Sequence, residues 1–201
     1  MQLSRYPRQI FAGLVMLVFA GSVNAAWNLN NDASRLSFIS IKKDTVAEVH
    51  KFSHLSGSVD DQGKVEVEIQ LASVDTAVPI RDERMRDLLF QTNLFPTAKV
   101  TAQVDPAEFI GLASGQFRNT ETQITVSLHG QSKQYKAAVS VIKLRGGSLL
   151  ISSIYPIVVN AGDFELAKGV EQLREIAKLP AISTAVPVSL VLVFTPAGST
   201  E

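Results

Sequence analysis

Cysteine is absent from all 201 residues of the chain. Disulfide bonds, thiolate metal sites and cysteine nucleophiles are therefore excluded. A bacterial lipoprotein is excluded too, because its lipid is attached to a cysteine at the cleavage site. We expect a fold that is held together by packing alone.

A hydrophobic run long enough to cross a bilayer is missing as well. Residues 10–20 form an apolar stretch, but a spanning helix needs about 20 such residues. Arg5 and Arg8 precede this stretch, and no acidic residue does. A positively charged start followed by a short apolar run is typical of a secretory signal peptide rather than of a membrane anchor.

Small residues mark the end of this leader. Val23 and Ala25 suit the −3 and −1 positions of a signal peptidase site. We expect cleavage after Ala25 or Ala26, so that residues 1–25 are a signal peptide and the protein works in the periplasm. The remainder, residues 26–201, is long enough for one domain with a good core, and no linker or internal repeat divides it.

An excess of positive charge is lacking too. The leader holds two of the 19 Lys and Arg and none of the 19 Asp and Glu, so the mature part has a net charge of −2. Nucleic-acid binding is driven mainly by the neutralisation of phosphates. This balance argues against a nucleic-acid partner, and no basic cluster indicates a membrane-surface patch.

The mature sequence is dominated by alternation of apolar and polar residues. Residues 64–71 (Lys-Val-Glu-Val-Glu-Ile-Gln-Leu) place apolar side chains on one face and polar side chains on the other, as a half-buried strand does. The turn residues 60–63 join this strand to residues 55–59 in a hairpin. Further strands are predicted over residues 27–29, 36–42, 45–52, 98–104, 124–129, 135–144, 149–159 and 186–194.

Two segments have helical spacing instead. Residues 79–90 begin with proline and place apolar side chains three and four positions apart. Residues 169–179 have the same apolar spacing and end before Pro180. The sequence therefore predicts an all-β protein, either a closed antiparallel barrel or a sandwich, of about eight or nine strands with one or two short helices. An eight-stranded barrel either fills with side chains or holds one small ligand.

Catalytic and metal-binding patterns are scarce. His50 and His54 would lie roughly 13 Å apart on one strand, too far to bind one metal ion. We expect both of them, and His129, to be surface residues. No serine stands in a Gly-x-Ser-x-Gly motif, although a Ser-His-Asp triad assembled by folding stays open.

The densest charge cluster covers residues 81–87 (Arg-Asp-Glu-Arg-Met-Arg-Asp). We expect a solvated helix face with ion pairs such as Glu83 with Arg86. The alternative is that Arg81, Arg84 or Arg86 holds an anionic head group at the mouth of a pocket.

Several motifs together resemble the YceI-like family. Its Ser-Ile-Asp-Thr, Arg-Asp-x-His-Leu-Arg, Phe and Phe-Pro pattern is matched by residues 73–76 (Ser-Val-Asp-Thr), Arg81-Asp82, Arg86, Phe90 and Phe95-Pro96. Its Trp-x-Leu-Asp-x-x-His-Ser start, Leu-x-x-Gly-x-Thr-Lys hairpin and Asp-Phe-Gly motif resemble residues 27–34, residues 128–133 and Asp163-Phe164. These motifs span nearly the whole mature chain in the family's order. Arg84, Met85 and Glu165 replace the usual His, Leu and Gly, which indicates a divergent subgroup.

The resemblance implies a lipocalin-like extended antiparallel β-barrel that binds a long-chain lipid such as a polyisoprenoid, with no catalysis, no metal and no cofactor. The alternative is a structural or protein-interaction barrel of the cell envelope with a filled core, and the sequence leaves a homodimer open. Arg81 and Arg86 are the candidates for a head-group contact. The candidates for lining the pocket are large apolar residues on inward strand faces and on residues 79–90: Phe38, Phe52, Met85, Leu89, Phe90, Phe95, Val100, Ile124, Val126 and Tyr135.

Overall fold

Alternating residues form strands along most of the chain in the computed structural model, which describes residues 25–198. The predicted signal peptide lies outside the described residues except for Ala25. The strands are β1 (Ala25–Leu29), β2 (Arg35–Lys42), β3 (Val46–Phe52), β4 (Leu55–Asp60), β5 (Lys64–Gln70), β6 (Val74–Asp75), β7 (Thr97–Gln103), β8 (Phe117–Leu128), β9 (Gln131–Lys143), β10 (Leu149–Ser153), β11 (Ile157–Asn160) and β12 (Ala185–Pro196). The helical elements are η1 (Leu71–Ser73), α1 (Pro79–Arg84), η2 (Met85–Phe90), α2 (Ala107–Ile110), η3 (Arg145–Gly147), η4 (Ala161–Phe164) and α3 (Ala167–Ile176).

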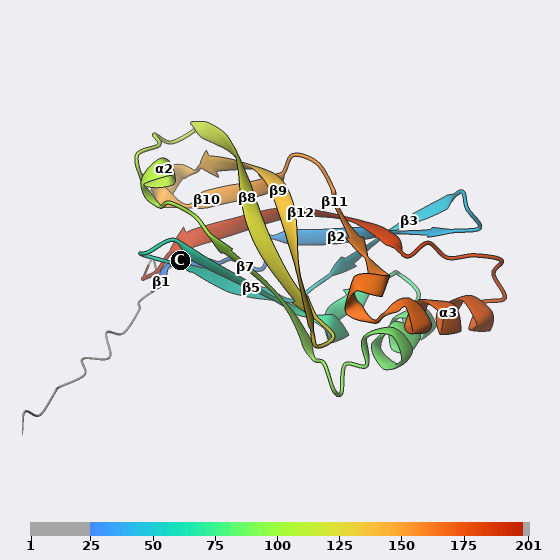
Figure 1. Ribbon diagram of the computed structural model, residues 1–201. Coiled ribbons are helices and arrows are strands. Elements are labelled where there is room, and N and C mark those ends of the chain that lie inside the picture. Colours follow the sequence, from blue (N-terminus) through green and yellow to red (C-terminus); the bar gives the residue numbers. More distant parts are fainter. Residues whose placement is uncertain (1–24, 199–201) are drawn as a thin grey trace, which may run out of the picture.

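Eight of these strands close a barrel (Figure 1). In spatial order they are β1, β4, β5, β7, β8, β9, β10 and β12, and β12 pairs back with β1. All of these pairs are antiparallel. At one end, β2 and β11 pair with opposite edges of β12, and β3 pairs with β2 and β6. The predicted lipocalin-like antiparallel barrel is confirmed.

Breaks in the long strands create the additional elements. Residues 30–34 separate β1 from β2, and residues 53–54 separate β3 from β4. Asn31 joins the two breaks, because its Nδ2 donates to the Ser53 carbonyl at 3.2 Å and its Oδ1 accepts from the Leu55 N–H at 2.7 Å. The side-chain amide thus supplies partners to backbone groups where the strand ladder is interrupted.

The prediction of one strand over residues 149–159 was wrong. The chain leaves the sheet between β10 and β11, at residues 154–156. Pro156 lies in this gap and has no N–H to donate to a strand ladder. The interruption therefore has a local cause, Pro156, although the segment as a whole is apolar enough to predict a strand.

The β8–β9 hairpin is longer than predicted. β8 has 12 residues and β9 has 13, and they pair along their full shared length. The first part of β8, residues 117–123, is polar apart from Phe117 and mostly exposed. It lacks the alternation on which the prediction depended, and its pairing with β9 makes it a strand. The hairpin turn consists of His129 and Gly130, whose φ values of 51° and 78° are those that a two-residue hairpin turn requires, and Gln131 already belongs to β9.

Helical segments cover one end of the barrel. The predicted helix over residues 79–90 starts at Pro79 but changes from α-helix to π-helix at Met85. The other predicted helix is α3, which packs on η2 at Gly169. A Cβ atom at Gly169 would lie 2.8 Å from the Leu88 carbonyl oxygen and 2.9 Å from the Leu89 Cα, so only glycine permits this approach without a shift. Figure 1 shows α3 beside this segment, at the end away from the unpredicted α2.

The core lies inside the barrel and under these helices. Phe164 and Phe194 are its most completely buried aromatic residues, at 0% and 1% exposure. Among residues 25–198, every helix is too short or too polar to cross a membrane.

Candidate functional site

Two apolar cavities lie inside the barrel. One has a volume of about 130 Å³ and the other of about 180 Å³. Each is several times the roughly 30 Å³ that one water molecule occupies in the liquid. Both are lined by Val100, Ile124, Ile157 and Leu190, so the two cavities meet at the middle of the barrel. We call these four residues the waist.

The first cavity lies toward α2. Trp27, Pro106 and Phe109 line its outer part. Trp27 is the only tryptophan of the chain, and its Nε1 donates to the Gly147 carbonyl at 3.1 Å. Every residue that lines this cavity is apolar except two threonines on β8, Thr120 and Thr122.

The second cavity lies toward the helical end. Leu89, Phe90, Leu166 and Val170 line it from η2 and from the α3 region, and the barrel strands supply the rest. All of its lining residues are apolar. An interior of this kind favours an apolar ligand, because a polar group that enters it loses its hydrogen bonds to water and finds no new partner.

Most of the predicted pocket residues surround the second cavity. Phe38, Phe52, Leu89, Phe90, Val100, Ile124 and Val126 line it. The other three line neither cavity. Met85 is buried in the core, and Phe95 packs on His129 with ring centroids 4.1 Å apart. Tyr135 donates its hydroxyl to Asp163 at 3.3 Å, and burial, followed by the Asp163 charge, raises the pKa of its phenol.

The lining also includes a strand that the prediction of the site left out. Five residues of β12 face the interior: Val186, Val188, Leu190, Leu192 and Phe194. They occupy every second position, so the period of two in residues 186–194 carried the signal that would have identified them. Phe164, Leu166 and Val170 had no such signal, because only the packing of α3 brings them to the cavity.

A polar network links the inward faces of β2 and β3 to α1. Glu48 Oε1 lies 2.8 Å from Lys42 Nζ, and Glu48 Oε2 lies 2.7 Å from Arg81 Nη1. Arg81 also donates to the Thr76 carbonyl and hydroxyl, and the Thr76 hydroxyl donates to Asp82 at 2.5 Å. The hydrogen bond from Lys42 lowers the pKa of Glu48, Arg81 lowers it further, and burial opposes both.

This network differs from the predicted charge cluster. Within residues 25–198, the predicted pair of Glu83 with Arg86 is not formed, and Arg81 pairs with Glu48 of β3 instead. The change to π-helix at Met85 alters the spacing on which an i,i+3 pair depends. Arg86 is half-buried and has no ion pair within the described residues. A head-group contact through Arg81 or Arg86 stays a prediction.

His50 corrects a second expectation. It was predicted to lie on the surface, but it is only 3% exposed because it occupies an inward position of β3, between Glu48 and Phe52. Its Nε2 lies 2.8 Å from Ser40 Oγ, and its Nδ1 has no partner within residues 25–198. Burial lowers the pKa of His50, and the positive charge of Arg81 lowers it further. A buried polar atom without a partner costs about 1–3 kcal/mol.

The other histidines differ from each other. His54 is exposed, as predicted. His129 is half-buried at the β8–β9 turn, and neither of its ring nitrogens has a partner within residues 25–198, which corrects the expectation of a surface residue. Among the same residues, no group of three or more histidine, aspartate and glutamate side chains is placed to hold a metal ion.

Comparison with known proteins identifies the class to which this barrel belongs. The YceI-like domain family matches residues 27–194, so the chain belongs to the YceI-like family. No curated protein sequence gives a significant match.

Solved structures add particular relatives. A polyisoprenoid-binding domain from Saccharophagus degradans is 37% identical, with a TM-score of 0.84 over 86% of this chain and 99% of that chain. BcnA from Burkholderia cenocepacia is 17% identical, with a TM-score of 0.62 over 82% of this chain and 98% of that chain. The Campylobacter jejuni YceI protein is 18% identical, with a TM-score of 0.51 over 76% of this chain and 85% of that chain. The last two share the fold.

Proposed function

We propose that this protein binds a long-chain apolar lipid, such as a polyisoprenoid, inside its barrel and carries or stores it in the periplasm without catalysis. The observation that carries the proposal is the pair of adjacent cavities, which share the four waist residues and whose lining is apolar apart from two threonines. The similarity to a polyisoprenoid-binding domain, at 37% identity over almost all of that chain, supports it. The predicted signal peptide supports the periplasmic location.

The volumes suit a thin chain rather than a bulky ligand. An engineered apolar cavity of about 150 Å³ binds one benzene molecule, so each of these cavities has room for a few carbon atoms. Together they lie at the lower end of the roughly 300–1,000 Å³ of ordinary ligand pockets. A flexible chain that passes the waist would occupy both.

Intrinsic fluorescence tests the proposal directly. Because Trp27 is the only tryptophan and lines the first cavity, a chain that enters there changes its emission. We expect saturable titration by a C20 isoprenoid alcohol. At a hundred times Kd the ligand should stabilise the fold by about 2.7 kcal/mol, which raises Tm by roughly 5–10 °C for a protein of this size.

A negative result has a defined meaning. A delipidated protein whose fluorescence and Tm do not respond to C10, C20 or longer isoprenoids would refute lipid binding. It would favour the alternative of a structural or protein-interaction barrel, which a pulldown with one stoichiometric protein partner would support.

A further inference from the structure

A row of aromatic rings connects the second cavity with His50. The Phe90 and Phe52 ring centroids are 5.8 Å apart, those of Phe52 and Phe38 are 5.4 Å apart, and those of Phe38 and His50 are 5.3 Å apart. The three phenylalanines line the cavity. The imidazole therefore lies next to the cavity wall, in register with Phe38 on β2.

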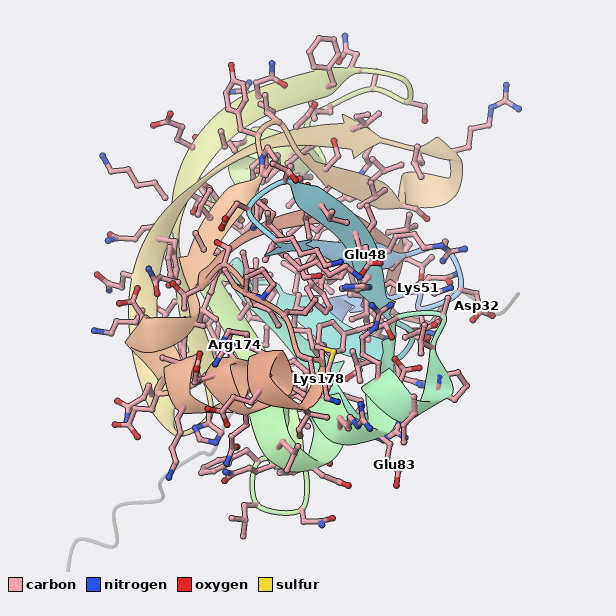
Figure 2. The ribbon with its side chains drawn as sticks, turned by 90° about the vertical axis from the view of Figure 1, so that its right-hand side faces the viewer. Asp32, Glu48, Lys51, Glu83, Arg174 and Lys178 are labelled. Carbon is pink, nitrogen blue, oxygen red and sulfur yellow. The ribbon has the colours of Figure 1, made fainter. Side chains whose placement is uncertain are left out.

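The charges beyond His50 are internally balanced. Two cations, Lys42 and Arg81, and two carboxylates, Glu48 and Asp82, form the polar network. Glu48 bonds to both cations, and Thr76 links Arg81 to Asp82. Figure 2 views this end of the barrel, with Glu48 on β3 toward the middle and Glu83 at the periphery. To gain a cation of this network, an anionic head group would have to displace Glu48 from Arg81 or from Lys42.

His50 Nδ1 is the buried side-chain atom of this region that has no hydrogen-bond partner among residues 25–198. If Nε2 carries the proton and donates to Ser40, then Nδ1 is an acceptor. If Ser40 donates to Nε2 instead, Nδ1 carries the proton and is a donor. A hydroxyl group both donates and accepts, so it fits either tautomer.

We propose that His50 Nδ1 binds the neutral polar head of the lipid, a hydroxyl group in the best case, beside Phe38 at the wall of the second cavity. This proposal rests on the proposed function and names the position and chemistry of the head. The burial of His50, the aromatic row and the balanced network select a neutral hydrogen-bonding head over a phosphate. Head recognition then depends on one imidazole rather than on an arginine cluster.

The test compares three C20 isoprenoid ligands that differ only in their head: an alcohol, a phosphate and a hydrocarbon. Each is titrated into wild type, His50→Phe and the control His54→Phe, which makes the same substitution at an exposed histidine. Wild type should bind the alcohol about fivefold more tightly than the hydrocarbon, the effect of one neutral hydrogen bond. His50→Phe should lose this preference, and His54→Phe should keep it.

The outcomes separate this inference from the proposed function. If none of the ligands binds, the proposed function fails. If the hydrocarbon binds but the alcohol has no advantage in wild type, or keeps it in His50→Phe, this inference alone is overturned. Tighter binding of the phosphate than of the alcohol also overturns it.

A second measurement does not depend on the folding of His50→Phe. In wild-type protein with ¹⁵N-labelled histidine, the alcohol should shift the Nδ1 resonance of His50, and the hydrocarbon should leave it nearly unchanged. An Nδ1 resonance that responds equally to both ligands, or to neither at saturation, contradicts the assignment.

Discussion

Substitution of Val100 by phenylalanine should divide the interior at the waist. Val100 lines both cavities and is half-buried. A phenyl group at this position can extend into the cavities that Val100 lines. Overpacking of a dense core costs about 1–3 kcal/mol, and the empty volume beside Val100 places this variant at the lower end of that range.

The expected loss of affinity follows from the segment of the lipid chain that the phenyl ring displaces. Removal of one isoprene unit, about five carbons, from apolar surroundings costs roughly 3–4 kcal/mol at ~0.8 kcal/mol per carbon, which is a factor of a hundred or more in Kd. A C20 alcohol should therefore bind Val100→Phe at least about a hundredfold more weakly. A C10 alcohol depends less on passage through the waist and should lose less than tenfold.

Trp27 fluorescence measures both affinities, and circular dichroism with thermal denaturation monitors the fold. Thr101→Phe is the matched control, because it adds the same ring at the next position of β7, which faces the opposite side. If Val100→Phe binds the C20 alcohol as tightly as wild type and Thr101→Phe do, the chain does not pass the waist and the reasoning is refuted.

Three further predictions concern the frame of the site. Gly169→Ala should lower stability by about 1–3 kcal/mol in thermal denaturation, because its Cβ would meet Leu88 and Leu89. The control Gly111→Ala, whose Cβ meets nothing within 4 Å, should leave stability unchanged. Equal effects of the two substitutions would contradict the close approach at Gly169. The pKa of Glu48 is lowered in the folded protein, so its carboxylate adds stability above the ordinary glutamate pKa. In urea unfolding, the loss of stability caused by Glu48→Gln should therefore shrink as the pH falls through the folded-state pKa. A loss that does not change with pH would show another cause. The pKa of His50 is lowered in the folded protein, so below pH ~6.5 the unfolded chain binds a proton more readily than the folded one. The free energy of unfolding of wild type should therefore fall between pH 7.5 and 5.5 relative to that of His50→Phe. The same pH dependence in both proteins would refute this.

The barrel could be predicted from the sequence because its strands carry local signals. Residues 64–71 alternate strictly, and the glycine at position 130 follows another alternating segment, residues 124–128. Strand formation in residues 117–123 depends instead on pairing with β9, which a local pattern cannot reveal. The break at Pro156 could have been inferred, since proline within a strand run indicates an edge or an interruption.

Fewer residues of the site than of the fold could be predicted from the sequence. Inward strand residues such as Phe38 and Ile124 follow from alternation, whereas Phe164 reaches the cavity only through tertiary packing. The burial of His50 could have been inferred, because His50 lies two positions from Phe52 and therefore on the same face of β3. The ion pair of Arg81 has no local signal in the sequence, because its partner Glu48 lies 33 residues earlier.

The most direct test of lipid binding is native mass spectrometry of the protein produced with its leader and purified from the periplasm. The account predicts a protein that begins at Ala26 or Trp27 and carries one non-covalent lipid, whose released mass corresponds to a long isoprenoid or similar apolar chain. A polypeptide that is isolated without lipid, and that still takes up none when incubated with C20 and longer isoprenoids, would contradict the account.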